Sequence, residues 1–460
     1  MPPTSPPVGQ SRTIGTPALV AAAAVAVAVV VWHVFALSID DPFYGLFKNF
    51  ADLSIYRAGG DAIVHRTGLY DDAILFGMQF TYTPFAAIVF APFALVSQTV
   101  TNLVWWSATF AALVALIAVS FRSLGYRLVP RLWLLSTFLA VAVTALEPVR
   151  STIWFGQINV FLVLLVVWDL TRPAGSRLRG TCSGIAAGIK LTPLFFLAYL
   201  AVTRQWRTAV TTGAAFAATI ALGFAVVPAD AWSYWTQQVM HAGRVGPVDA
   251  PSNQSANGML AQLLRFYDVT AYQDPVTGVF APPTWMWLLF AGTLAAAGLA
   301  AADLAHRRGH VLLAVVLTGM NSAVASPFSW GHHWVWFVPL LVIALHYAAT
   351  SGRRLALLAP VIVTVPTFSW WWHYRGGEPL HGTDHPIGIG LFMFPRFYPY
   401  WWTDVLVPIY ASCYLLVFVA AVAATVTLTH AAQHDTDGPR LPRILGRKLA
   451  SNDATERAAA

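Results

Sequence analysis

The stretch PALVAAAAVAVAVVVWHVFAL, residues 17–37, decides the fold class of this chain. It contains no Asp, Glu, Lys or Arg, and about 20 such residues are what a helix needs to cross the hydrocarbon core of a bilayer. The run is too long for the core of a signal peptide, and no small-residue cleavage site precedes Asp40 and Asp41. We therefore interpret it as a retained transmembrane helix.

Similar apolar windows recur along nearly the whole chain. They lie near residues 84–97, 101–119, 132–146, 152–169, 181–203, 208–228, 284–304, 311–325, 333–348, 355–368 and 405–429. Hydrophobic residues make up 57% of the 460 residues, charged residues only 10%, and the mean hydropathy is +0.61. A soluble core cannot bury that much apolar surface. The sequence therefore predicts an all-α, polytopic membrane protein.

The positions of Lys and Arg predict the topology, because basic residues in short loops stay on the cytoplasmic side. The pattern is consistent with cytoplasmic termini if two windows do not cross fully. Window 84–97 is short and starts at Pro84, so we expect it to give one net crossing together with 101–119. Window 181–203 is interrupted by Lys190 and Pro193, so we expect two half-helices that return to the same side. This leaves about ten crossings, with 10 to 12 transmembrane or re-entrant helices in all.

The predicted organisation is one membrane domain over residues 17–430, without a tandem repeat or a soluble globular unit. Residues 1–16 and the basic tail 431–460 read as disordered cytoplasmic ends, since both are rich in Pro, Arg and small residues. Three long loops, near 38–83, 229–283 and 369–404, are expected on the extracytoplasmic side. These loops hold most of the unusual polar and aromatic residues.

Several functional classes are disfavoured. The net charge of +7 is scattered over short loops and the tail, which is typical of membrane topology and not of a nucleic-acid partner. Cys182 and Cys413 both lie in apolar windows and predict packing, with neither a disulfide framework nor a CxxC metal pair. A P-loop glycine signature, a GxSxG elbow and an HExxH motif are all absent from the sequence.

A carboxylate in the first loop is the candidate catalytic base. The loop contains Phe50-Ala51-Asp52-Leu53-Ser54-Ile55-Tyr56-Arg57. A carboxylate at the membrane surface can accept the proton of an attacking sugar hydroxyl. The alternative is that Asp52 caps a short helix running through Leu53 and Tyr56.

Polar residues inside apolar windows form a second set of candidates. Gln157 and Asn159 open a span, where each amide needs a partner; interhelical hydrogen bonding is the alternative to a sugar-binding role. Lys190 lies far from either end of its apolar run, and a membrane-embedded lysine marks a functional site by default. We expect it to supply a counter-charge for a phosphate, with snorkelling to the membrane surface as the alternative.

Two further clusters fall in or beside the outer loops. Asn253-Gln254-Ser255 suits recognition of sugar hydroxyls, although a plain turn explains it equally well. His332 and His333 lie where one span ends and the next begins. Adjacent histidines bind a metal or, when protonated, a phosphate. Neighbouring residues of a helix point about 100° apart, so we expect one histidine to act and the other to pack.

The third loop is rich in aromatic residues, which suit the membrane interface and would also stack on sugar faces or hold a prenyl chain. They are Trp370, Trp371, Trp372, His373, Tyr374, Phe394, Tyr398, Tyr400, Trp401 and Trp402.

Taken in order, these motifs resemble a known family over roughly residues 50–335. They are the loop Asp, G-x-YD at 68–71, Y-x-P at 82–84, GQ-x-N at 156–159, K-x-x-P at 190–193, NQS at 253–255 and SP-x-SW-x-HHW at 326–334. The set resembles the polyprenol-phosphate-mannose-dependent α-1,2-mannosyltransferases of actinobacteria, in the branch that extends phosphatidylinositol mannosides. Those enzymes have the GT-C glycosyltransferase fold.

The resemblance implies roles for individual residues. Asp52 would be the general base, within the D-x-x-x-Y context that Tyr56 completes. His332 or His333 would contact the donor phosphate and Lys190 would add charge there. Weaker sugar or acceptor contacts would come from Tyr56, Arg57, Gln157, Asn159, Asn253, Gln254 and Trp330.

The chemistry of the residues agrees with inversion. Turning a β-linked mannosyl phosphate into an α-mannoside needs one base and a stabilised leaving phosphate, whereas retention needs a second carboxylate. Phosphate is already a good leaving group, so neither a general acid nor a metal nor another cofactor is implied. The expected partners are the lipid-linked donor, a glycolipid acceptor and membrane lipids, in the plasma membrane.

Other functions remain compatible with the sequence. A lipomannan-branching mannosyltransferase or an arabinofuranosyltransferase would show much the same layout. A secondary transporter or a lipid-linked-sugar flippase would also use broken helices and membrane lysines. The long aromatic loops and the absence of a visible repeat count against these two.

Overall fold

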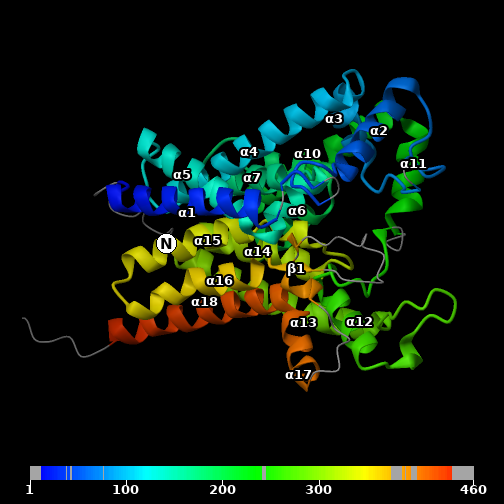
Figure 1. Ribbon diagram of the computed structural model, residues 1–460. Helices are drawn as coiled ribbons and strands as arrows, with labels where there is room; N and C mark the ends of the chain where they lie inside the picture. Colours follow the sequence, from blue (N-terminus) through cyan, green and yellow to red (C-terminus); the bar gives the residue numbers. More distant parts are fainter. Residues whose placement is uncertain are drawn as a thin grey trace, which may run out of the picture.

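The computed structural model describes residues 12–437, apart from residues 38, 42–43, 76, 241–244, 374–385, 389 and 395–400. Helices dominate this part of the chain and most of them run side by side as one bundle (Figure 1). The all-α prediction is confirmed except for one short ribbon of two strands.

Within the described residues, four helices are long and apolar enough to cross a membrane by length and composition. They are α1 (Thr16–Phe35), α4 (Gln98–Ser123), α10 (Trp206–Val226) and α13 (Thr284–Arg307). Much of their surface stays exposed, since only 17% to 44% of each apolar window is buried inside the protein. Lipid is the solvent that this surface requires.

Shorter apolar helices complete the bundle. They are α3 (Pro84–Ala94), α5 (Pro130–Ala142) with η1 (Val143–Ala145), α7 (Asn159–Leu170), η2 (Thr192–Phe195) with α9 (Phe196–Val202), α14 (Val311–Ala325), α15 (Phe337–Thr350), η7 (Arg354–Leu357) with α16 (Leu358–Thr367), and α18 (Cys413–Asp437). Twelve of the fifteen residues of α14 are buried, which makes this helix the centre of the core.

The remaining helices of the described chain belong to neither of these two groups. They are α2 (Ala51–His65), α6 (Glu147–Phe155), α8 (Thr181–Ile189), α11 (Pro228–Thr236), η3 (Gln238–Met240), α12 (Ala256–Phe266), η5 (Thr270–Tyr272), η6 (Gly331–Trp334), η8 (Leu391–Met393) and α17 (Trp401–Tyr410). Figure 1 shows α2, α3, α11, α12 and α17 gathered at one end of the bundle. These elements therefore form a cap made largely from the three long loops.

Two predicted continuous windows contain a break. Window 152–169 is divided between α6 and α7, because Gly156 takes a left-handed conformation with φ of 71°. Window 405–429 is divided between α17 and α18, which are separated by Ala411 and Ser412. Neither break was predicted, since hydropathy does not register a turn of two or three residues inside an apolar window.

The ribbon pairs β1 (Trp371–His373) with β2 (Pro386–Gly388) in antiparallel register. Arg150 of α6 donates from Nη1 to the carbonyl of Gly388 at 3.1 Å, which ties this ribbon to the bundle. Of the aromatic residues predicted in this loop, Tyr374, Tyr398 and Tyr400 lie outside the described residues.

Window 181–203 is a broken helix, as the sequence predicts. Lys190 leaves the helical conformation with φ of −142° and ψ of 131°, between α8 and η2. Arg179, just before α8, donates from Nη1 to the side-chain carbonyl of Gln205, just after α9, at 2.7 Å. The start of α8 and the end of α9 therefore lie next to each other, as predicted for two half-helices that return to the same side.

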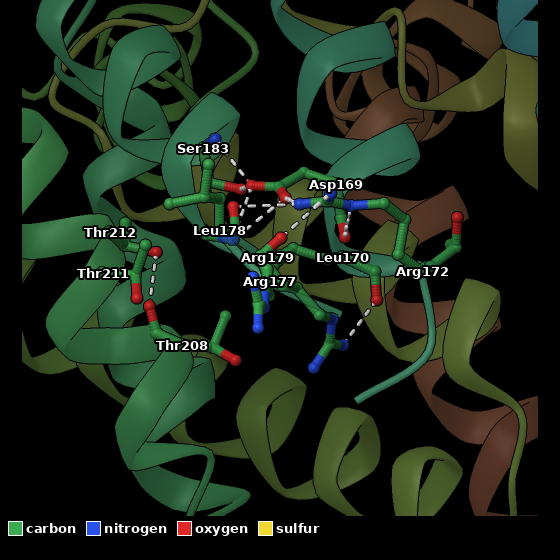
Figure 2. Close-up of polar contacts among 12 residues, drawn as sticks. Asp169, Leu170, Arg172, Arg177, Leu178, Arg179, Ser183, Thr208, Thr211 and Thr212 are labelled. Carbon is green, nitrogen blue, oxygen red and sulfur yellow. Dashed lines mark hydrogen bonds and ion pairs between the residues drawn. The ribbon is translucent and has the colours of Figure 1, made fainter. Parts of the chain in front are cut away.

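A buried carboxylate anchors the entry to this hairpin. Figure 2 shows Asp169 of α7 pointing at the start of α8, where it accepts hydrogen bonds from the backbone of Gly180 and from Ser183 at 2.9 to 3.0 Å. Arg172 donates to the same carboxylate at 2.6 Å. The bonds that Asp169 accepts from Gly180 and Ser183 satisfy backbone donors that the first turn of α8 would otherwise leave unpaired.

The two ends of the described chain lie at the same end of the bundle. In Figure 1, α1 begins and α18 ends opposite the cap. Arg12 donates to the imidazole of His346 at 2.8 Å, and its backbone N–H donates to the carbonyl of Gly125. Residues 1–11 and 438–460, which hold most of the two ends predicted to be disordered, lie outside the described residues. Helix α18 likewise continues to Asp437, past the predicted start of the tail at 431.

Candidate active site

Asp52 lies in the first turn of α2, at the cap end of the bundle. It is not the N-cap: that position is Phe50, and Asn49 accepts the hydrogen bond from the backbone of Ala51 at 2.9 Å. The carboxylate of Asp52 instead accepts from the amide Nε2 of Gln157. The alternative that Asp52 serves as a helix cap was therefore wrong.

Burial raises the pKa of Asp52 to about 6, while the hydrogen bond from Gln157 and the positive charge of Lys190 oppose that rise. A carboxylate with this pKa is largely ionised at neutral pH. It is also a stronger base than an exposed aspartate, which suits removal of a proton from a hydroxyl group.

Gln157 connects Asp52 to two tyrosines. Its Oε1 accepts from the hydroxyl of Tyr56 at 2.8 Å and from that of Tyr82 at 3.3 Å. The two hydroxyls are 2.7 Å apart. Each polar atom of the amide thus has a defined partner, which fixes the orientation of the side chain and of the carboxylate beside it.

Lys190 brings the positive charge into the same cluster. Its Nζ donates to Asn159 Oδ1 at 3.1 Å and to His333 Nε2 at 2.9 Å, and lies 3.5 Å from the hydroxyl of Tyr82. The ammonium also lies over the ring of Tyr82, 5.4 Å from its centroid. These contacts hold the ammonium within the cluster, so it does not snorkel to the membrane surface.

Tyr82 belongs to the Y-x-P motif but was not predicted as a site residue. It contacts both Gln157, beside Asp52, and Lys190. Its neighbour Thr83 caps α3 and donates from its hydroxyl to the carbonyl of Gly188 at 2.5 Å. Tyr82 and Thr83 therefore connect the Asp52 side of the cluster to the end of α8, next to Lys190. In the sequence, the only mark of Tyr82 is its place two residues before Pro84, which does not separate a site residue from an ordinary helix start.

The two histidines lie on η6, which packs against α6. The ring of His332 packs edge to face on Phe155, with centroids 5.6 Å apart, and its carbonyl accepts from Asn159 Nδ2 at 2.9 Å. His333 accepts from Lys190, so its Nε2 carries no proton. His332 therefore packs on Phe155 and His333 contacts Lys190, while which of the two meets a donor phosphate stays a prediction.

His332 retains an unused nitrogen, since its Nε2 is buried and has no hydrogen-bond partner within the described chain. The imidazole of His333 lies against the backbone of Phe328 in addition to Lys190. Burial lowers the pKa of both side chains well below the usual value, and the charge of Lys190 lowers it further. A neutral imidazole still donates one N–H group, so contact between these histidines and a phosphate does not require their protonation.

No cluster of three His, Cys, Asp or Glu side chains that could hold a metal ion is found among the residues that the structure describes. A mechanism without a metal remains a prediction, for which metal removal is the test.

Arg57 points away from the cluster. Its guanidinium donates to the carbonyls of Phe93 at 3.1 Å and Val96 at 3.0 Å, where α3 ends. This contact holds α3 against α2. The predicted sugar or acceptor contact of Arg57 has no support from this geometry.

Asn253 and Gln254 bind backbone groups. Asn253 Oδ1 accepts from the backbone of Ser329 at 2.9 Å and its Nδ2 donates to Val248 at 2.9 Å. Gln254 Nε2 donates to Ala411 at 2.8 Å. Trp330 lies beside Phe328, with ring centroids 5.8 Å apart. These residues hold the segment that leads into the histidine turn, Gly331–Trp334. Their sugar contacts stay predictions.

A cavity of about 30 Å³ lies beneath Asn159 and His333, between α7, η2 and α14. Thr192 and Ser322 add hydroxyl groups to its wall, and Trp336 adds an apolar surface. A space of this size accommodates roughly one or two water molecules. It is too small for a prenyl chain.

A half-buried carboxylate, joined through amides and tyrosines to a lysine–histidine pair at one end of a polytopic helix bundle, fits a membrane glycosyltransferase. Comparison with known proteins agrees with this class. The model of glycosyltransferase family 87 matches residues 80–327, more than half of the chain. The chain belongs to this family and is a glycosyltransferase.

Curated relatives come from mycobacteria. A polyprenol-phosphate-mannose-dependent α-(1-2)-phosphatidylinositol mannoside mannosyltransferase of Mycobacterium tuberculosis is 34% identical over 67% of this chain and 73% of its own length. A polyprenol-phosphate-mannose-dependent α-(1-2)-phosphatidylinositol pentamannoside mannosyltransferase of Mycolicibacterium smegmatis is 35% identical over 69% of this chain and 76% of its own length. A second Mycolicibacterium smegmatis relative, described as a phosphatidylinositol mannoside mannosyltransferase, is 30% identical over 86% of this chain and 89% of its own. No solved structure shows significant similarity to the chain.

Proposed function

We propose that this enzyme transfers mannose from polyprenyl-phosphate-mannose to a phosphatidylinositol mannoside or a related glycolipid, forming an α-1,2 linkage with inversion. The observation that carries the proposal is the continuous contact path from Asp52 through Gln157 and Tyr82 to Lys190 and His333. This path joins a carboxylate to a cationic side chain, which supports the roles of base and counter-charge that the proposal gives them. The names of the mycobacterial relatives support the donor and the acceptor.

The reaction follows from this arrangement. An acceptor hydroxyl attacks the anomeric carbon of the donor and its proton passes to Asp52. The bond between that carbon and the phosphate oxygen breaks, and polyprenyl phosphate leaves with the bonding electrons. Lys190 and the neutral N–H groups of the histidines stabilise the charge that develops on the phosphate. Attack and departure on opposite faces invert the anomeric centre.

The site faces the extracytoplasmic side in this proposal. It lies at the cap end of the bundle, opposite the described ends of the chain (Figure 1). Arginines gather at the other end, where Arg172 and Arg179 surround the start of α8 (Figure 2). Basic residues favour the cytoplasmic side, so the cap with Asp52 belongs on the outer side of a plasma membrane.

A transporter or flippase has no comparable support. The re-entrant helix is common to transporters, but membership of a glycosyltransferase family accounts for it equally well. A related acceptor, such as a lipomannan chain, stays within the same chemistry and is decided only by assay.

The test is mannose transfer in nanodiscs from labelled polyprenyl-phosphate-mannose to a mixture of phosphatidylinositol mannosides. We expect an elongated lipid whose new residue is released by an α-1,2-specific mannosidase. Polyprenyl-phosphate-glucose serves as the donor control. Transfer from another lipid-linked sugar, but not from the mannose donor, would contradict the proposal.

A further inference from the structure

A buried carboxylate outside the proposed mechanism lies directly beneath the histidine turn. Glu147 begins α6 and is only 8% exposed. The hydroxyl of Tyr414 donates to its Oε2 at 2.5 Å, and Arg150, one turn further along α6, is the nearby positive charge. Burial of a carboxylate is costly, so a position that keeps one needs a reason.

The carboxylate lies against Gly331. A Cβ atom added at Gly331 would overlap both oxygens of Glu147, so the close approach depends on the missing side chain. Gly331 immediately precedes His332, whose ring rests on Phe155 at the other end of the same helix. Helix α6 therefore holds the turn at two points, with Glu147 under its first residue.

Tyr414 supports the turn from the C-terminal helix. It is fully buried, and its ring lies edge to face against Trp334 at 5.8 Å and Phe337 at 5.1 Å. Trp334 closes the turn that starts at Gly331. The pair formed by Glu147 and Tyr414 thus contacts the first and the last residue of η6, and the two histidines lie between these contacts.

We propose that Glu147 and Tyr414 are positioning residues for the donor, which fix the Gly331–Trp334 turn so that its histidines meet the donor phosphate beside Lys190. This inference rests on the proposed function. Neither residue needs to touch the donor: displacement of a binding group by about 1 Å is enough to cost a large factor in rate or affinity.

The test compares Glu147→Ala, Glu147→Gln and Tyr414→Phe with the native enzyme. The first readout is the Kd for polyprenyl phosphate, followed through the tryptophan fluorescence of the protein in nanodiscs. The second is the split between KM for the donor and KM for the acceptor in mannose transfer. Tyr199→Phe is the matched control, because Tyr199 is equally buried and loses a similar hydrogen bond, to His306 at 3.0 Å.

We expect Glu147→Ala and Tyr414→Phe to raise the Kd and the donor KM about tenfold while the acceptor KM stays within twofold. Glu147→Gln should recover most of the loss, since its amide oxygen still accepts from Tyr414. Tyr199→Phe should change neither constant. If Glu147→Ala does not fold, Tyr414→Phe and Glu147→Gln decide the question.

Unchanged Kd and donor KM in Tyr414→Phe and the Glu147 variants, with reduced yield or kcat only, would overturn the positioning role and leave the proposed function intact. A native enzyme that binds polyprenyl phosphate but transfers no mannose would overturn the proposed function, while the Kd series still decides the role of Glu147. A native enzyme that does not bind polyprenyl phosphate would overturn both.

Discussion

The amide of Gln157 holds the carboxylate of Asp52, donating from Nε2 to Oδ2 across 105 residues of sequence. The two residues come from different elements, α2 and the turn between α6 and α7. The same amide accepts from two tyrosine hydroxyls, so it cannot rotate without losing these bonds. This relationship orients the base and leads to the first prediction.

Replacing Gln157 by alanine should lower kcat/KM for mannose transfer about 10- to 100-fold, because an unheld base catalyses less well. The acid limb of the pH profile should also move to higher pH, since a hydrogen bond to the charged form lowers the pKa of Asp52. Gln98→Ala is the control; its amide bonds only Asn102, on α4. An unchanged profile in Gln157→Ala would show that the amide does not act on the base.

The raised pKa of Asp52 predicts the pH dependence of the native enzyme. The base works only when ionised, so kcat/KM should fall as the pH drops through about 6. The measurement is kcat/KM from pH 5 to 8 in nanodiscs of fixed composition. A midpoint near 4, the usual value for an exposed aspartate, would contradict the burial of this carboxylate.

Lys190 should matter for charge. Lys190→Met should reduce kcat about 100-fold or more, because the positive charge that stabilises the leaving phosphate is lost. Lys190→Arg should retain part of the activity. Lys48→Met, at an exposed lysine in the first loop, provides the control. Equal activity of Lys190→Met and the native enzyme would remove the lysine from the site.

Asn253 should affect stability more than catalysis. Its amide bonds the backbone of Ser329 and Val248 in a fully buried position, so Asn253→Ala should cost about 1–3 kcal/mol in unfolding free energy. Thermal unfolding and steady-state kinetics at low temperature separate the two effects. A normal melting temperature with a raised KM for the acceptor would instead favour the sugar contact predicted from sequence.

Metal removal is expected to have no effect. Prolonged treatment with a chelator should leave mannose transfer unchanged, because phosphate leaves readily and Lys190 supplies the counter-charge. Activity that is lost and then restored by a divalent cation would contradict the metal-free mechanism.

Most of the cluster could be predicted because polar residues in apolar windows carry a cost that sequence makes visible. Lys190, Gln157 and Asn159 stand out for this reason, and the structure brings all three together. The re-entrant helix follows from the same reasoning, since Lys190 and Pro193 mark its break. Hydropathy alone thus located the centre of the site.

Other features depend on contacts between distant segments, which one sequence does not reveal. The bond from Tyr414 to Glu147 spans 267 residues, and nothing local marks either residue as a partner of the histidine turn. An amide such as Asn253 looks the same in sequence whether it faces a sugar or a backbone carbonyl. Burial in the folded protein lowers the pKa of both histidines, and the sequence gives no sign of that burial.

The most direct test of the central claim is mannose transfer by native enzyme and Asp52→Asn side by side in nanodiscs, with polyprenyl phosphate affinity measured on both samples. Asparagine keeps the shape of the side chain but cannot take a proton. The account predicts that Asp52→Asn binds polyprenyl phosphate as the native enzyme does and forms no elongated mannolipid. Near-native turnover by Asp52→Asn would show that another residue is the base.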